Sequence, residues 1–105
     1  MSIEFENKTT WEEYASSLTR NATDTERLML AVCFRFEVEN IDTSDVRVVV
    51  NDYFRRARWS RPVNLSATAN YCASKGWLTE TNKIKNHKDW RITRKGFDAI
   101  KSKVV

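Results

Sequence analysis

The chain has 105 residues, of which 41% are hydrophobic and 30% are charged, with two glycines, one proline and a formal net charge of +4. This length suits one domain with a single modest core, and so little glycine and proline argues against a loop-rich fold or a β-sandwich. The sequence has no apolar run long enough to span a bilayer and no signal-peptide pattern. We therefore expect a cytoplasmic protein without membrane partners.

A short helix is predicted near the amino terminus, after a tail. Thr9 and Thr10 each precede a glutamate by three residues, which is the spacing of a capping box. Trp11, Tyr14 and Leu18 then follow at helical spacing and form an apolar face. This face either covers the domain or meets a second copy of the chain, so a homodimer is one expected assembly.

Two further helices are predicted before the single proline. The capping box of Thr23 and Glu26 opens the first, which reaches about residue 39 and is apolar on nearly every face, as a buried core helix is. A capping residue at 42–44 opens the second, whose inward stripe is Val46, Val49, Val50 and Tyr53. Three consecutive valines also suit a strand, but the helical spacing and the polar flanks favour a helix.

The next helix, predicted over residues 63–75, carries most of the functional argument. Leu65, Ala69 and Cys72 repeat at the spacing of one buried face, and Gly76 follows where the left-handed residue that ends a helix is expected. The other faces carry side chains that are small or that donate and accept hydrogen bonds. Such a face can lie close to another surface, although the simpler interpretation is a solvated helix face.

A β-hairpin and a closing helix are predicted after this helix. Residues 77–81 and 90–93 are rich in aromatic and β-branched side chains, and the loop 82–88 between them is too polar to be buried. Thr93 can cap the closing helix. Gly96 costs that helix about 1 kcal/mol relative to alanine, which indicates that another segment packs closely against it.

The carboxyl-terminal part of the chain resembles winged helix-turn-helix proteins. The resemblance is carried by Asn64-Leu65-Ser66, by Cys72, by Lys75-Gly76-Trp77-Leu78 and by Trp90-Arg91-Ile92-Thr93-Arg94-Lys95-Gly96-Phe97. These segments look like the recognition helix, the wing and the closing helix of that superfamily. The resemblance implies a mainly α fold with a small β-hairpin, of class α+β. Residues 1–22 would then be a tail and an additional helix, and residues 23–105 the winged-helix domain.

One departure from the superfamily pattern concerns the turn before the recognition helix. A helix-turn-helix turn usually takes three or four residues, whereas the segment from Arg55 to Pro62 is longer and contains Trp59. The angle between the two helices is therefore left open by the sequence.

Charge is divided between the two parts of the sequence. Residues 1–45 hold ten acidic and four basic residues, a net charge of −6, and residues 46–105 hold fourteen basic and four acidic residues, a net charge of +10. A charge run is more often a solvated face. Here two basic runs fall before the predicted recognition helix and in the predicted wing, the elements that meet the phosphate backbone in a winged helix.

We therefore predict a double-stranded-DNA-binding protein, a transcriptional regulator or an accessory DNA-binding factor. The helix over 63–75 would lie in the major groove, with Asn70 as the best candidate for a bidentate contact to adenine, and the wing over 77–93 would contact the adjacent backbone or minor groove. The predicted DNA-binding residues are Arg55, Arg56, Arg58, Arg61, Asn64, Ser66, Thr68, Asn70, Tyr71, Lys75, Lys83, Lys85, Lys88 and Arg91.

Other chemistry has little support in the sequence. His87 is the only histidine, so no Ser/His/Asp or Cys/His constellation can be proposed, and neither a metal-ligand spacing nor a glycine-rich phosphate loop is present. We expect no enzymatic activity and no cofactor. Cys33 and Cys72 are predicted to be buried free thiols.

The main alternative function is a winged helix that binds another protein and not DNA. The acidic amino-terminal half, with the helix that contains Trp11, would then meet the partner. A fold alone does not decide between these functions. Binding to RNA or to an anionic membrane is a third and weaker alternative.

Overall fold

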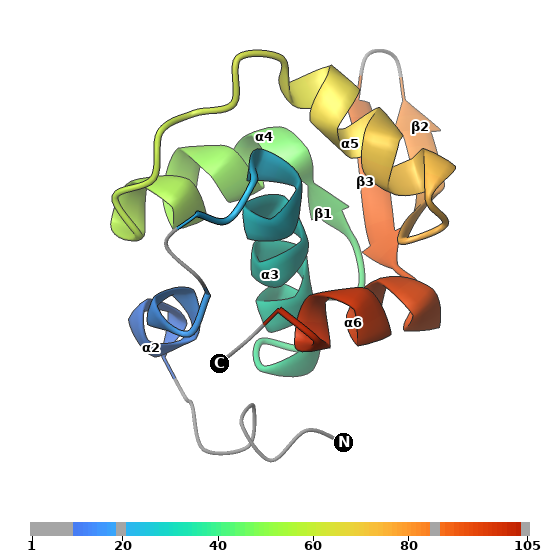
Figure 1. Ribbon diagram of the computed structural model, residues 1–105. Helices are drawn as coiled ribbons and strands as arrows, with labels where there is room; N and C mark the ends of the chain where they lie inside the picture. The colour runs from blue at the N-terminus through green and yellow to red at the C-terminus, as the bar shows by residue number, and fades with distance from the viewer. Residues whose placement is uncertain (1–9, 19–20, 85–86, 104–105) are drawn as a thin grey trace.

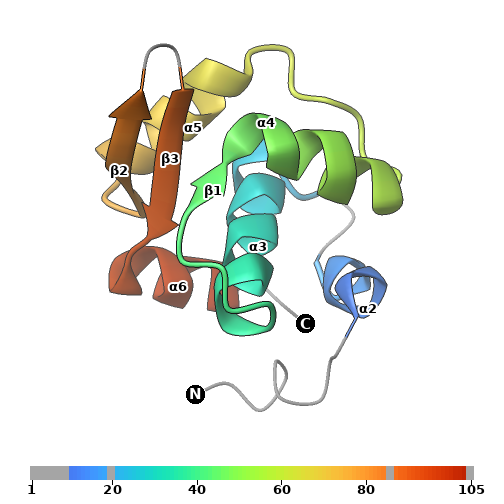
Figure 2. The ribbon, with the colours of Figure 1, turned by 180° about the vertical axis from the view of Figure 1, so that it is seen from behind.

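The computed structural model describes residues 10–18, 21–84 and 87–103, and the side chains of these residues outside 82–88. The helices are α2 (Trp11–Ser16), α3 (Asp24–Glu37), α4 (Val46–Val49), α5 (Leu65–Ser74) and α6 (Arg94–Lys101), and a π-helical segment, η1 (Val50–Phe54), continues α4. The strands are β1 (Ser44–Asp45), β2 (Leu78–Ile84) and β3 (His87–Ile92). The helices are grouped around α3, and the small antiparallel sheet lies to one side of them (Figures 1 and 2). The predicted α+β class is confirmed.

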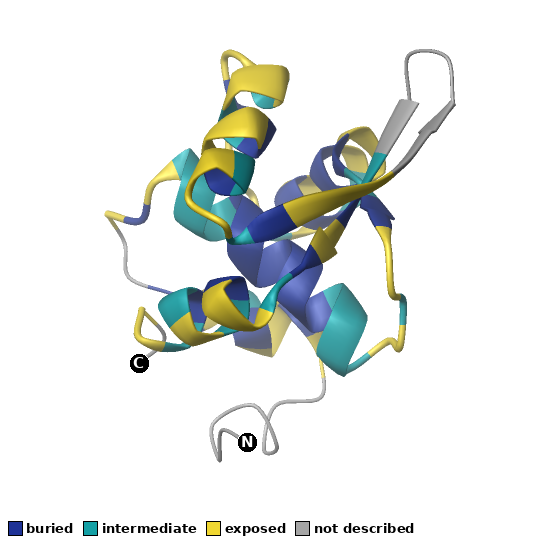
Figure 3. Cartoon of the chain, turned by 90° about the vertical axis from the view of Figure 1, so that its right-hand side faces the viewer, coloured by how far each residue is buried: buried dark blue, intermediate teal, exposed yellow. Residues whose placement is uncertain are grey.

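Helix α3 forms the centre of the core. The capping box predicted from the sequence is present, because the Glu26 amide donates to the Thr23 hydroxyl and the Thr23 amide donates to the Glu26 carboxylate. Every residue from Leu28 to Phe34 is buried, so all faces of this part of the helix contact other elements. Figure 3 shows these buried residues gathered at the middle of the molecule.

Helix α2 covers the domain with its apolar face. Trp11 and Tyr14 are both 0% exposed. The Trp11 ring packs against Phe34, Tyr53 and Trp59, with ring centroids 5.4–5.5 Å apart. Of the two arrangements expected for this helix, covering the domain is the one observed. The apolar stripe of α2 is therefore not available as a surface for a second copy.

A strand that the sequence analysis did not predict joins the hairpin to the helices. Ser44 pairs with Trp90 and Asp45 pairs with Asp89, which makes a three-stranded sheet of order β1-β3-β2. Ser44 lies in this strand and not at a helix cap, and the cap of α4 is Asp45, whose carboxylate accepts from the Arg47 amide. A strand of two residues is too short to show a periodicity, so only the structure reveals it.

The hairpin strands are longer than expected. Strands β2 and β3 pair from Leu78 and Ile92 at the base to Ile84 and His87. Most of the segment 82–88, which was predicted to be a loop because it is polar, therefore belongs to the strands. Polar residues also occur in strands of antiparallel sheets, so polarity alone was a poor guide here.

Two glycines fix the joint between α5, the hairpin and α6. Gly76 has φ of +78°, as predicted for the residue that ends α5. A Cβ atom on Gly96 would lie 2.2 Å from the carbonyl oxygen of Trp77 and 2.8 Å from Cε of Met29. The Thr93 side chain caps α6 and its hydroxyl donates to the Gly76 carbonyl at 2.5 Å. The close packing predicted at Gly96 is thus confirmed.

The segment between η1 and α5 is long, as the sequence indicated. The helix that contains η1 ends near Arg56, and the chain returns across the outside of the domain through residues 57–64 (Figure 1). Helix α5 begins at Leu65, two residues later than predicted, because Asn64 is its extended N-cap. The amino-terminal end of α5 consequently lies beside the beginning of α4, where Val46 and Leu65 line one groove.

Candidate nucleic-acid interface

Helix α5 has a buried side and an exposed polar side. Ala69 and Cys72 are buried, as the predicted spacing requires. Ser66, Asn70 and Tyr71, which were predicted to contact DNA, are exposed. The exposed side therefore consists mainly of short side chains that donate and accept hydrogen bonds, and another surface can come close to the helix backbone there.

Two other predicted contact residues form bonds within α5 itself. The Asn64 side-chain oxygen accepts from the Ala67 amide at 3.0 Å, which satisfies one of the free N–H groups of the first turn. The Thr68 hydroxyl donates to the Asn64 carbonyl at 3.1 Å, and Thr68 is only half-exposed. These bonds fix the start of the helix, so the position of the exposed face depends on Asn64.

The carboxyl-terminal end of the exposed face is formed by an aromatic pair and a cation. Tyr71 is 48% exposed and meets Trp77 edge to face, with ring centroids 6.2 Å apart. The ammonium group of Lys75 lies 5.4 Å from the centre of the Tyr71 ring, within the range of a cation–π contact. Lys75 thus keeps its charge at the surface next to Tyr71.

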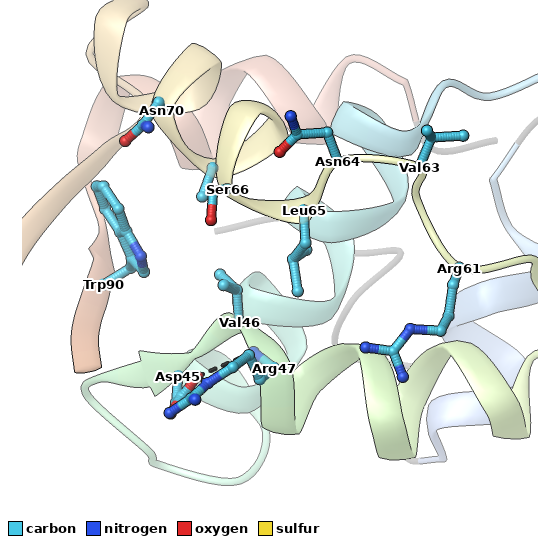
Figure 4. Close-up of a pocket in the computed structure, with 11 residues that line it drawn as sticks. Asp45, Val46, Arg47, Arg61, Val63, Asn64, Leu65, Ser66, Asn70 and Trp90 are labelled. Carbon is cyan, nitrogen blue, oxygen red and sulfur yellow. Dashed lines mark hydrogen bonds and ion pairs between the residues drawn. The ribbon is translucent and has the colours of Figure 1, made fainter. Parts of the chain in front are cut away.

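A groove of about 390 Å³ borders α5 on the side of α4. Ser66 and Asn70 line it from α5, and Trp90 lines it from β3. Figure 4 shows these three side chains at one end of the groove and Arg61 at the other, with Arg47 beside the start of α4. The groove thus combines hydrogen-bonding groups of α5 with two guanidinium groups.

Three arginines follow the outer surface of α4 and η1, and we call Arg47, Arg55 and Arg61 the arginine stripe. Arg47, Asn51 and Arg55 are exposed and follow one another at intervals of four residues. Arg61 reaches this surface from the loop, because its Nη1 donates to the Asn51 side-chain oxygen at 2.7 Å. Arg61 lines both the groove beside α5 and a second hollow, which Arg55 and Trp59 also line.

Arg47 is paired with Asp45, the residue that caps its helix. Arg47 Nη2 and Asp45 Oδ2 are 3.0 Å apart, and Arg47 Nε donates to Asp45 Oδ1 at 3.3 Å. Hydrogen bonding to Asp45 raises the pKa of Arg47. The Arg47 side chain is still 49% exposed. Arg47 was not among the predicted contact residues because it stands among valines, although its spacing to Arg55 was a usable signal.

Arg56 belongs to a different part of the surface. Its guanidinium donates to Glu12 of α2 at 3.2 and 3.3 Å and lies 3.9 Å from Asp52. Hydrogen bonding to Arg56 lowers the pKa of Glu12. Arg56, which was predicted to bind phosphate, is therefore engaged with carboxylates in this structure.

The four arginines before Pro62 are thus not gathered at one place. The end of η1 lies at the opposite side of the molecule from α5 (Figure 1). Arg58 is exposed in the turn after that end, where it has φ of +59°. Of these four arginines, only Arg61 lines the groove beside α5. Arg55 lines a second hollow together with Arg61. A run that is continuous in sequence is divided between two surfaces.

The predicted wing contacts are described only in part. Lys83, Lys85 and Lys88 lie outside the described side chains. Arg91 is exposed on β3, while its neighbours Trp90 and Ile92 are buried, so it lies on the outer face of the strand. It is one residue pair from the base of the hairpin. Arg91 is therefore separated from the groove by the strand itself.

Burial suppresses thiol chemistry at the two cysteines. Cys33 and Cys72 are free and 0% exposed, as predicted. Desolvation raises the pKa of both thiols, and that of Cys72 reaches about 12. Within the described ranges, no three His, Cys, Asp or Glu side chains are grouped so that they could bind a metal ion. No helix in the described part of the chain is both long and apolar enough to cross a membrane.

Within the described residues, the groove beside α5 thus brings exposed polar side chains of α5 together with Arg47 and Arg61. We compared the chain with protein-family models, with curated proteins and with solved structures, and none of them matched. The function of this protein is therefore inferred from the geometry of this surface.

Proposed function

We propose that this protein is a winged helix-turn-helix protein that binds double-stranded DNA, as a transcriptional regulator or an accessory DNA-binding factor. Helix α5 would be the recognition helix and the β2–β3 hairpin the wing. The element order supports this proposal, because α3, β1, α4 and α5 are followed by a hairpin and a closing helix. The pairing of β1 with β3 also supports it, since it attaches the hairpin to the helices.

The observation that carries the proposal is the position of the polar side of α5 beside the arginine stripe. The major groove of DNA is about 12 Å wide and admits one helix. A helix whose exposed residues are as short as Ser66 and Asn70 can approach the base edges closely. Arg61, at the groove beside α5, would then bind a phosphate next to the DNA groove that α5 occupies, and Arg55 would bind one farther along the stripe. Asn70 is the residue expected to contact adenine through two hydrogen bonds.

The distribution of acidic residues also favours this orientation. Glu12 and Glu13 are exposed residues of α2. Helix α2 lies on the side of the molecule away from α5 and the hairpin (Figure 2). A molecule with a basic and an acidic side is steered toward a polyanion with its basic side first.

The test is fluorescence anisotropy with a labelled duplex of mixed sequence at two salt concentrations. We expect micromolar binding that weakens steeply with salt. An Arg55→Gln/Arg61→Gln double variant should bind more weakly, whereas Arg58→Gln, which removes a charge outside the stripe, should have a smaller effect. Absence of binding by the wild type at low salt would contradict the proposal.

A protein-binding role without DNA is the second candidate, and two exposed valines favour it. Val63 is 104% exposed and Val48 is 49% exposed. The surface first expected for this role, the apolar face of the helix with Trp11, is buried, so these valines would have to serve instead. Sedimentation velocity of the wild type and of a Val48→Ser/Val63→Ser variant distinguishes a homodimer through this surface from a monomer.

A further inference from the structure

The groove between α4 and α5 suggests how the arginine stripe meets a nucleic acid, and this inference rests on the proposed DNA binding. We propose that Arg47 and Arg61 bind phosphates of one DNA strand, and that Asp45 competes with the DNA phosphate for Arg47. The site would thus be a phosphodiester-binding groove with an internal anionic competitor.

Both guanidinium groups already hold oxygen atoms in the free protein. Arg47 makes a two-point contact with the Asp45 carboxylate, through Nη2 at 3.0 Å and Nε at 3.3 Å. Arg61 donates to the Asn51 side-chain oxygen at 2.7 Å. Phosphate oxygens accept hydrogen bonds from arginine in the same forked geometry. The guanidinium groups of Arg47 and Arg61 are therefore oriented to donate hydrogen bonds to oxygen acceptors, and phosphodiester oxygens are such acceptors.

The two arginines are also suitably placed with respect to α5. Arg47 and Arg61 line the groove that Ser66 and Asn70 line from the opposite side. Arg61 is held to Asn51, which follows Arg47 at four residues on the same exposed surface. A DNA strand whose phosphates follow the exposed surface of Arg47, Asn51 and Arg61 would present its base edges toward Asn70. Backbone binding and base recognition would then occur on two sides of one groove.

Asp45 is suited to be a competitor because its pair with Arg47 is exchangeable. The side chains of Arg47 and Asp45 are 49% and 20% exposed, so water and salt screen their attraction. Arg47 can exchange the Asp45 carboxylate for a phosphate, whose oxygens accept hydrogen bonds from a guanidinium in the same way. The Asp45 carboxylate would keep its bond to the Arg47 amide, which caps α4. It would also remain close to the DNA as a repelling charge.

The substitution Asp45→Asn separates the helix-capping role of this residue from its negative charge. Asparagine caps a helix as well as aspartate does, so Asp45→Asn keeps the start of α4 and removes the competing carboxylate. Asp52→Asn is the matched control, because it removes the same charge from the same helix, next to Arg56 and not next to Arg47. For the arginines the control is Arg94→Gln, an exposed residue of α6, and this helix lies at the bottom of Figure 1 whereas α4 and α5 lie at the top.

The experiment measures dissociation constants of the full chain for a labelled mixed-sequence duplex at several salt concentrations, after far-UV circular dichroism has verified that each variant is folded. Arg47→Gln and Arg61→Gln should each weaken binding about tenfold and reduce the slope of log K against log salt by about one. Asp45→Asn should tighten binding about threefold more than Asp52→Asn does. A gain in affinity is a result that misfolding cannot imitate.

The outcomes distinguish this inference from the proposed function. If the wild type binds DNA but Arg47→Gln and Arg61→Gln behave like Arg94→Gln, the phosphate site is wrong while DNA binding stands. If Asp45→Asn binds no more tightly than Asp52→Asn, the competition is wrong. If the wild type binds no duplex even at low salt, the proposed function fails and this inference fails with it.

Discussion

The indole N–H of Trp11 donates to the main-chain carbonyl of Tyr53 at 2.7 Å, and the same carbonyl accepts from the Ala57 amide at 3.0 Å. Tyr53 belongs to the π-helical segment η1. A residue of α2 therefore stabilises the segment that separates Arg47 from Arg55. Helix α2 is in this respect part of the domain.

Replacing this tryptophan tests that role. Trp11→Phe keeps an aromatic ring but removes the donor and part of a fully buried side chain. We expect the free energy of unfolding to fall by about 2 kcal/mol, from the lost hydrogen bond and the reduced packing. Urea denaturation followed by circular dichroism measures it. Tyr71→Phe is the control, since Tyr71 is 48% exposed and should change stability by less than about 0.5 kcal/mol. An equal loss in both variants would contradict the role.

Gly96→Ala should destabilise the protein although alanine is the better helix former. The added Cβ would lie 2.2 Å from the Trp77 carbonyl oxygen, so α6 would have to move. We expect a loss of about 2 kcal/mol, because overpacking outweighs the helix-propensity gain of about 1 kcal/mol. Asp98→Ala, at an exposed position of the same helix, is the control. Thermal unfolding measures the stability of the two variants. A Gly96→Ala protein that is more stable than the wild type would refute the close packing at Gly96.

Stability should fall at alkaline pH because of the buried thiols. The pKa of Cys72 rises from 9.0 to about 12 on folding, and burial also raises that of Cys33. Between the unfolded and folded values, the unfolded chain binds fewer protons than the folded one, so the free energy of unfolding declines as pH rises. The stabilisation is fully present below about pH 9 and is lost as pH rises toward 12.

Urea titrations at pH values from 8 to 10.5 test this dependence. Each buried thiol should contribute a decline of about 1.4 kcal/mol per pH unit within its range. Cys72→Ala should therefore show a shallower decline than the wild type, even though its stability at pH 8 is lower. A parallel decline in the two proteins would mean that this thiol is not protected from ionisation.

Asn64 should act on DNA binding only through the start of α5. Asn64→Ser retains a side-chain oxygen that can cap the helix, so we expect wild-type stability and an affinity for duplex DNA within about twofold. Asn64→Ala removes the cap and should reduce the free energy of unfolding by about 1 kcal/mol. A Ser variant that is stable but binds poorly would show instead that the Asn64 amide contacts DNA.

Asn70 should determine one position of the preferred sequence. Selection from a random duplex library by the wild type and by Asn70→Ala should yield sites that differ at one base pair, where the variant loses its preference for A·T. The expected discrimination is about 1–3 kcal/mol for a bidentate contact. Ser66→Ala is the comparison on the same face of α5. If the Asn70→Ala sites are unchanged, Asn70 does not contact a base.

Local signals in the sequence predicted the helices well. The Thr23–Glu26 capping box, the all-round apolar pattern before Phe34 and the glycine at 76 each have a direct physical cause, and each is present in the structure. The apolar face of the first helix was also recognised, although the sequence did not say whether the domain or a second copy would cover it. Hydrophobic periodicity predicts that one face of a helix is buried, but it does not identify the segment or the molecule that covers that face.

The candidate site was harder to predict because it depends on where segments meet. The run from Arg55 to Arg61 is continuous in sequence, yet the turn at Arg58 sends the chain back across the domain and divides the run. Arg47 lies fourteen residues before Arg61 in the sequence and both line one groove. Net charge per segment detects such arginines, but only tertiary structure shows which of them share a surface.

Strand β1 determines more than the size of the sheet. Ser44, which pairs with Trp90, also accepts a hydrogen bond from Arg35 Nε at 2.8 Å, and Asp45 both pairs with the hairpin and caps α4. The hairpin and the beginning of α4 are thus joined directly through β1. If both bind phosphates as proposed, the separation between these phosphates is set by the protein. A duplex would then be selected for the width of its grooves as well as for its bases, and sequences that deform to that width at low cost would be preferred.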